Sequence, residues 1–200
     1  LTEAEEMYKL SLEICQRLAE DNPKAYKPEV AMTLNNLAVL YKNTQKFTEA
    51  ENMYKQALEI YKHLVKNNPQ TYEPGMVNTL CNQAILYMDT QRIKEAELKL
   101  KEALEITQRL AQDNPNAYEA DVLEILNNLA VLYYNTQRFT EAENMYKLTL
   151  KIYQQLAEAN PKAYESDVAM SLNNLALLYS NTQRFLEAEE MYKQALEIRK

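Results

Sequence analysis

Apolar residues recur along the whole chain at spacings typical of helices. Leu34, Leu37, Ala38 and Tyr41 follow the i, i+3, i+4, i+7 pattern, which predicts an amphipathic helix of about fifteen residues that starts near Val30. A second stripe predicts a longer helix, of about twenty residues. The apolar positions of this second stripe are Ala50, Tyr54, Ala57, Leu58, Tyr61 and Leu64. The chain is therefore expected to alternate between these two kinds of helix.

The two stripes return together every 46 residues. The columns that keep this step include Leu34, Leu80, Leu126 and Leu172; Tyr41, Tyr87, Tyr133 and Tyr179; Gln45, Gln91, Gln137 and Gln183; and Ala50, Ala96, Ala142 and Ala188. A fixed period of this size is typical of a stacked repeat array, in which each unit buries its apolar face against its neighbours. The small alanine columns allow helices to approach closely, and leucine and tyrosine fill the remaining space. The sequence therefore predicts an all-α protein built as an α-solenoid.

The repeat boundaries predict one continuous array over residues 1–200. Residues 1–22 match the second helix of a unit whose first helix is missing. Complete helix pairs are expected at 30–68, 76–114 and 122–160, and a last, shortened pair at 168–200. Neither end carries a polar capping helix, so both are expected to be cut from a longer array.

Local signals predict where the helices end and begin. The Asn-Pro pairs at 22–23, 68–69, 114–115 and 160–161 are expected to end the longer helix and open a loop. Tyr26 and its equivalents at 72, 118 and 164 would pack from this loop over the core between units. The sequence from Thr48 to Glu51 is predicted to form a capping box at the start of the longer helix. Gln83 replaces the leucine found at Leu37, and a buried amide without a partner would make this repeat the softest.

Composition and charge narrow the range of functions. Gly75 is the only glycine and the net charge is −7, which suits helices and leaves no concentrated basic face for nucleic acid. No apolar run reaches the length that spans a membrane. Cys15 and Cys81 lie within apolar helical patterns and are predicted to be reduced thiols, which suits a cytoplasmic location.

The unit resembles a tetratricopeptide repeat, in which a large residue, a Leu-Ala pair, an aromatic residue and two alanines fall at set positions. Those positions hold Leu34, Leu37-Ala38, Tyr41, Ala50, Tyr54 and Ala57. The long unit and the string Leu-Asn-Asn-Leu-Ala look most like the kinesin-light-chain and bacterial subclass. The resemblance implies a right-handed superhelix of antiparallel helix pairs, whose first helices line a concave groove. Members of that subclass often have glycine where Gln45 stands, so this turn is expected to accommodate a side chain.

The residues provide little for catalysis. His63 is the only histidine and has no metal-ligand pattern around it, neither cysteine has an identifiable base beside it, and a single glycine cannot form a phosphate-binding loop. We therefore expect no enzymatic activity, no metal and no cofactor.

The remaining candidate is a protein surface. Asparagines alternate with apolar residues on the side of the first helices opposite the leucine stripe, and an amide can both donate to and accept from the backbone of a bound peptide. The predicted groove residues are Asn35, Asn36, Val39, Asn43, Asn82, Ile85, Asn127, Asn128, Val131, Tyr134, Asn135, Asn173, Asn174, Leu177 and Asn181. Asn35, Asn127 and Asn173 are expected to face the ligand, whereas the column of Asn36 is equally consistent with bonds to the next helix. Glu124 is acidic and Lys42 is the only basic groove residue, which argues against a clamp for a terminal carboxylate.

Three functions fit these observations. The preferred hypothesis is a non-enzymatic scaffold that binds a peptide segment of a partner protein in the groove. The first alternative is a structural spacer or a rod that associates with itself end to end through apolar faces. The second is a regulatory arm of a larger multidomain protein.

Overall fold

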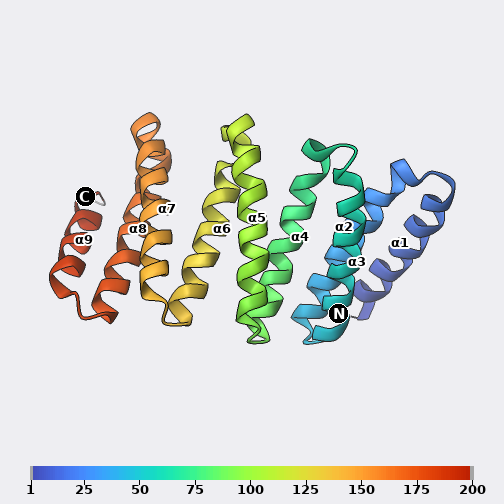
Figure 1. Ribbon diagram of the computed structural model, residues 1–200, viewed down its shortest axis with the longest axis horizontal. Coiled ribbons are helices and arrows are strands. Elements are labelled where there is room, and N and C mark those ends of the chain that lie inside the picture. The colour runs from blue at the N-terminus through green and yellow to red at the C-terminus, as the bar shows by residue number, and fades with distance from the viewer. Residues whose placement is uncertain (1, 199–200) are drawn as a thin grey trace. The chain divides into compact units, whose positions relative to one another are not determined.

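The computed structural model describes residues 2–198, and these form nine helices and no strand. The helices are α1 (Thr2–Asp21), α2 (Pro23–Asn43), α3 (Phe47–Val65), α4 (Pro69–Asp89), α5 (Ile93–Asp113), α6 (Pro115–Asn135), α7 (Phe139–Ala159), α8 (Pro161–Asn181) and α9 (Phe185–Ile198). Short turns join consecutive helices, which reverse direction each time within α1–α5 and within α6–α9 (Figure 1). The all-α prediction is confirmed.

The helices divide into two compact units, residues 1–118 and 119–200. In the first unit α2 packs against α1, α3 and α4, and α4 in turn packs against α3 and α5. In the second unit α8 packs between α7 and α9. Helices α2, α4 and α8 thus each lie between the odd-numbered helices that precede and follow them in sequence, which is the packing expected of stacked helix pairs.

The alanine columns lie in the core of these stacks. Ala38, Ala50 and Ala57 are fully buried, and their small side chains allow close approach of the helices. Leu34 and Tyr54 are also fully buried and fill the space between the helices. The core therefore follows the columns that the period predicts.

The prediction that each Asn-Pro pair opens a loop is wrong. The pair both ends one helix and begins the next, because proline at the first helical position lacks only an amide that would have no partner there. At α2 the Asn22 side chain accepts a hydrogen bond from the amide of Ala25 at 3.3 Å, as an N-cap does. The even-numbered helices therefore start at Pro23, Pro69, Pro115 and Pro161 rather than near residues 30, 76, 122 and 168, and Tyr26 with its equivalents lies in a helix.

The capping-box prediction is also wrong. Helix α3 begins at Phe47 with Lys46 as its N-cap, and the N-cap residue makes no side-chain capping hydrogen bond. Thr48 is consequently inside the first turn, and α7 repeats this arrangement with Arg138 as its N-cap.

The turn between the helices of a pair depends on one residue in a left-handed conformation. Gln45, Gln91, Gln137 and Gln183 have φ values of 60°, 59°, 59° and 61°. The preceding threonine secures the helix end, since Thr44 Oγ1 donates to the carbonyl of Leu40 at 2.9 Å, and the amide of Lys46 then donates to Tyr41 at 2.8 Å. A glycine would adopt this φ without strain, so the turn accommodates a side chain as the sequence suggested.

Candidate peptide-binding face

A carboxylate on α1, on α3 and on α7 bonds to the next even-numbered helix and to the basic residue that follows it. Glu51 on α3 accepts a hydrogen bond from Arg92 Nη1 at 2.6 Å and another from the Tyr87 hydroxyl at 3.2 Å. The Arg92 guanidinium also lies over the Tyr87 ring, 4.2 Å from its centroid, a favourable cation–π contact. We call this arrangement the carboxylate clasp.

The clasp recurs at other repeats. In the second unit Glu143 binds Arg184 and the Tyr179 hydroxyl, and Arg184 lies over the Tyr179 ring at 4.1 Å. Hydrogen bonds from arginine and then from lysine hold the pKa of Glu51 and of Glu143 at about 2. These carboxylates are therefore charged at neutral pH, and their bonds join α3 to α4 and α7 to α8.

On α2 and α4 the polar groove residues bond to one another. The Asn82 amide donates to Asn35 Oδ1 at 3.2 Å, and the Asn35 amide donates to Asn78 Oδ1 at 3.3 Å. Further along the same two helices, Lys42 Nζ lies 3.9 Å from an Asp89 carboxylate oxygen. The polar groups of this part of the face are thus largely committed to joining α2 to α4.

The prediction that Asn35 is exposed to a ligand is wrong. Its exposed fraction is 7%, and its amide also donates to Asn36 Oδ1 at 3.4 Å. A side chain that is buried and bonded on both its oxygen and its nitrogen has a structural role. Asn82, which is in the column of Asn36, donates to Asn35 on the neighbouring helix. For this residue the structure therefore agrees with the interpretation that the column bonds to an adjacent helix.

On α6 and α8 the asparagines are differently placed. Asn127 is exposed and Asn128, Asn173 and Asn174 are half-buried. Within residues 2–198 none of these four side chains makes a hydrogen bond to another part of the chain. Each therefore keeps its donors and acceptors for a molecule outside the chain.

The other predicted groove residues surround these two groups. In the first unit Asn36, Val39 and Ile85 are half-buried and Asn43 is exposed; in the second unit Val131 and Tyr134 are half-buried and Leu177, Asn135 and Asn181 are exposed. Asn181 donates to the Tyr134 hydroxyl, which links α6 to α8. Leu177 has an exposed fraction of 49%, so α8 presents an apolar side chain one turn after Asn173 and Asn174.

The chemistry of the face favours binding over catalysis. Glu124 is the exposed charged residue near the free amides, and residues 2–198 contain no group of three or more histidine, cysteine or carboxylate side chains that could hold a metal ion. Likewise, no helix described by the structure is long and apolar enough to cross a bilayer.

Sequence reasoning missed the carboxylate clasp, although its residues stand in columns. Glu5, Glu51 and Glu143 lie one period or two apart, and so do the basic residues that bind them, Lys46, Arg92 and Arg184. A search for columns of opposite charge could have found the clasp.

These observations define a helix-pair repeat protein whose even-numbered helices present a polar face. The chain belongs to the tetratricopeptide repeat family, whose models match residues 30–70, 75–155 and 121–200. A comparison of the sequence with curated proteins finds no significant match.

Solved structures share this fold at low sequence identity. The chain is similar to BtubC (BKLC) of P. vanneervenii, with 24% identity, a TM-score of 0.54, and coverage of 98% of this chain and 89% of the other. It is also similar to a Podosopora anserina protein assigned as a kinesin light chain with nearly identical TPR-like repeats, with 18% identity, a TM-score of 0.67, and coverage of 96% and 87%. A third is the Rap conjugation regulator of plasmid pLS20, solved with the Phr* peptide, with 18% identity, a TM-score of 0.58, and coverage of 98% of this chain but 47% of the other. The resemblance to the kinesin-light-chain type of repeat is confirmed.

Proposed function

We propose that this chain is a non-enzymatic scaffold for protein–protein interaction, and that the face of α6 and α8 binds an extended peptide segment of a partner. The observation that carries this proposal is the group of four amides on α6 and α8 that have no hydrogen-bond partner within the described chain. The Rap regulator, a protein of the same fold, was solved with a peptide bound, which supports the class of ligand.

The amides can recognise a peptide through its backbone. An extended segment presents a carbonyl and an N–H at each residue, and an asparagine side chain can bond to both. Val131 and Leu177 lie beside the amides on the same helices and offer apolar contacts for alternate side chains of the peptide. The absence of a basic cluster on α6 and α8 means that a terminal carboxylate is not required of the ligand.

The proposal is tested with variants of the two asparagine groups. Peptides selected from a random phage-displayed library against the full chain are synthesised, and their Kd is measured by fluorescence anisotropy. Asn127→Ala together with Asn173→Ala is expected to weaken binding by about tenfold or more, with no change in Tm because neither side chain bonds within the chain.

Asn35→Ala is the matched control. It removes a buried amide that joins α2 to α4, so it should lower Tm and leave the peptide Kd within about twofold. If the double variant lowers Tm and binding together, or if both variants affect binding equally, the proposed site is wrong.

A further inference from the structure

The contacts between successive even-numbered helices follow one register. Asn82 on α4 donates to Asn35 on α2, 47 positions earlier. Asn181 on α8 donates to Tyr134 on α6 at the same offset of 47. Asn35 also bonds to Asn78, at an offset of 43. The register therefore shows which side chains lie opposite one another where α6 and α8 meet, a line that we call the α6–α8 seam.

In the first unit this register brings three amides together. Asn35 and Asn82 each donate to Asn78 Oδ1, at 3.3 and 3.0 Å. Asn82 also donates to Asn35 Oδ1 at 3.2 Å. We call these three side chains the amide triad. The equivalent residues at the α6–α8 seam, two periods later, are Asn127, Met170 and Asn174.

Met170 prevents an amide triad from forming at the seam. It occupies the position of Asn78, and its thioether is a weak acceptor and cannot donate. Asn127 and Asn174 make no hydrogen bond to any residue of the chain from 2 to 198. Met170 is itself 48% exposed. The seam therefore presents two uncommitted amides with an apolar side chain beside them.

The seam also presents a carboxylate. Glu124 on α6 is in the same column as Met170 and is exposed, and it makes no ion pair with the described part of the chain. Helix α6 carries Glu119, Asp121 and Glu124 but no lysine or arginine, and the whole chain has a net charge of −7. A cationic group is therefore attracted to α6 and finds an uncommitted carboxylate there.

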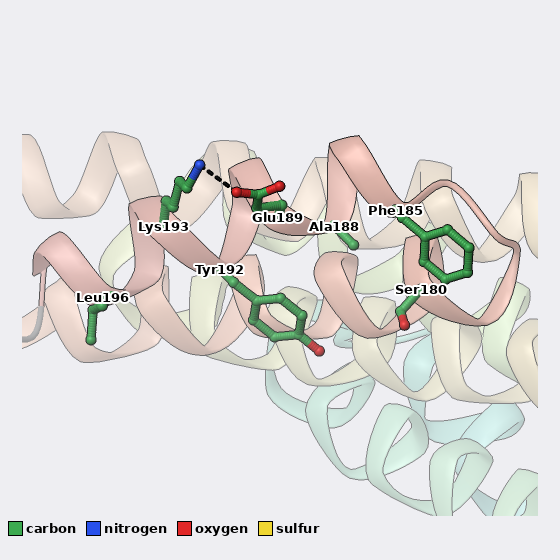
Figure 2. Close-up of a pocket in the computed structure, with 7 residues that line it drawn as sticks. All are labelled: Ser180, Phe185, Ala188, Glu189, Tyr192, Lys193 and Leu196. Carbon is green, nitrogen blue, oxygen red and sulfur yellow. Dashed lines mark ion pairs between the residues drawn. The ribbon is translucent and has the colours of Figure 1, made fainter.

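One end of the seam is closed. The hydrogen bond from Asn181 to the Tyr134 hydroxyl joins the two helices there, and Ser180 lines a separate depression on α9 together with Phe185 (Figure 2). Because each unit of a repeat array contacts its neighbours through its flanks, the seam is not a surface on which another unit stacks. The open part of the seam lies toward Glu124.

Given the proposed peptide site on α6 and α8, we propose that its ligand carries a lysine or arginine that pairs with Glu124 and an apolar side chain that packs on Met170. Adjacent packed helices lie about 8–10 Å apart, and alternate side chains of an extended peptide point the same way about 7 Å apart. A flexible basic side chain covers the difference. The two residues therefore stand two positions apart in the peptide, and the backbone between them lies over Asn127 and Asn174.

The test compares two selections from a random phage-displayed library, one against the wild-type chain and one against Glu124→Lys. The wild type should enrich peptides with lysine or arginine two positions from an apolar residue. Glu124→Lys should enrich aspartate or glutamate in place of the basic residue. Glu158→Lys is the matched control, because Glu158 is exposed on α7 and its substitution changes the net charge equally, and it should keep the wild-type preference.

Fluorescence anisotropy with the selected peptides measures the contribution of the ion pair. Glu124→Gln should raise the Kd of a basic peptide about fivefold. It should have no effect once the basic residue of the peptide is replaced by glutamine, because both changes remove the same ion pair.

The apolar contact is tested with Met170→Asn, which places at the seam the residue type of Asn78. It should raise the Kd of the same peptide about fivefold, and it should raise Tm because the amide triad can then form. Met170→Leu retains an apolar side chain and should leave the Kd within about twofold.

Three results would overturn the proposal. The first is a set of selected peptides without a preferred basic residue. The second is the same change of preference with Glu158→Lys as with Glu124→Lys, since net charge alone would then attract the peptide. The third is the same Kd for Met170→Asn and Met170→Leu.

The outcome for the proposed peptide site is read separately. If the Asn127→Ala, Asn173→Ala chain loses the peptides while Glu124→Lys binds them unchanged, the peptide site stands and the basic ligand is wrong. A library that yields no binder to the wild type would overturn both.

Discussion

The repeat that begins with α4 and the one that begins with α8 are both helix pairs, but they differ in whether their buried polar atoms have hydrogen-bond partners. Leu175 is buried in α8, and Gln83 occupies the equivalent position in α4. Gln83 is 1% exposed, and its side-chain oxygen lacks a hydrogen-bond partner. The Tyr54 hydroxyl on α3 and one oxygen of Glu73 on α4 are also buried without a partner. Within residues 2–198, the buried side-chain atoms that lack partners are these three, and all lie in the first unit.

This difference shows which columns specify the fold. Leu80, Ala84 and Leu86 remain apolar and fully buried around Gln83, so the helix still packs although one position is polar. Glu73 is 3% exposed but is bound through its other oxygen to Arg109 at 2.6 Å. In a linear array the cost of such substitutions stays within the repeat and its neighbours, so stability should differ along the chain while the fold does not.

The largest effect is expected when the polar core residue is transferred to the α8 repeat. Leu175→Gln removes a buried leucine and leaves an amide in its place, which should lower the free energy of unfolding by about 3 kcal/mol. Urea unfolding followed by hydrogen exchange of individual helices measures the loss and shows whether it is confined to α7, α8 and α9. Leu177→Gln on the exposed side of α8 is the control and should cost much less. Equal costs would mean that Leu175 does not form part of the core.

The clasp is common to both repeats and should give both the same dependence on pH. The pKa of Glu51 and of Glu143 is about 2 in the folded state, against 4.5 for an unperturbed glutamate. Each ionised carboxylate therefore stabilises the fold fully above the unfolded pKa. That contribution is lost as pH falls from about 5 toward 2. Glu51→Gln should therefore lower the free energy of unfolding by about 1 to 2 kcal/mol at pH 7, an estimate already reduced because Arg92 is partly exposed to solvent. Near pH 2 the substitution should have almost no effect on stability.

The measurement is urea unfolding of the wild type, Glu51→Gln and Glu143→Gln at pH 7, 5, 4 and 3. Each variant should show a shallower loss of stability with acid than the wild type, and the two variants should agree. A variant as steep as the wild type would show that its carboxylate does not supply the acid sensitivity.

Substituting leucine in the α4 repeat should reduce the difference between the two regions. Gln83→Leu replaces a buried oxygen without a partner by the residue found at Leu37 and Leu175, so it should stabilise the chain by about 1 kcal/mol. Urea unfolding provides the value, and Gln70→Leu, at an exposed position of α4, should leave it unchanged. A loss of stability would show that the Gln83 side-chain nitrogen makes an interaction that stabilises the fold by more than the unpaired oxygen destabilises it.

The burial of Gln83 and the alanine columns followed from the sequence because the period places each residue in a known environment. The start of the even-numbered helices did not, because residues 23–29 are mostly exposed and carry no apolar periodicity, and an Asn-Pro pair signals a helix end as readily as a helix start. The bonding of Asn35 depends on how far α2 lies from α4, a distance that no single helix pattern contains. Fold and core were therefore predictable, whereas the division of the asparagines into bonded and free groups required the structure.

The smallest effect concerns the turns, which the two regions share. Gln91 in the first unit and Gln183 in the second have φ of 59° and 61°, so glycine at either position should relieve the same strain. Because glycine also adds entropy to the unfolded chain, the net gain is expected to be about 0.5 kcal/mol at each site. Thermal unfolding of Gln91→Gly and Gln183→Gly measures it. Gln56→Gly, at an exposed position inside helix α3, is the control and should lose about 1 kcal/mol. If the two substitutions increase stability by different amounts, part of the difference in stability between the repeats lies in their turns. If the increases are equal, that difference lies in the core around Gln83.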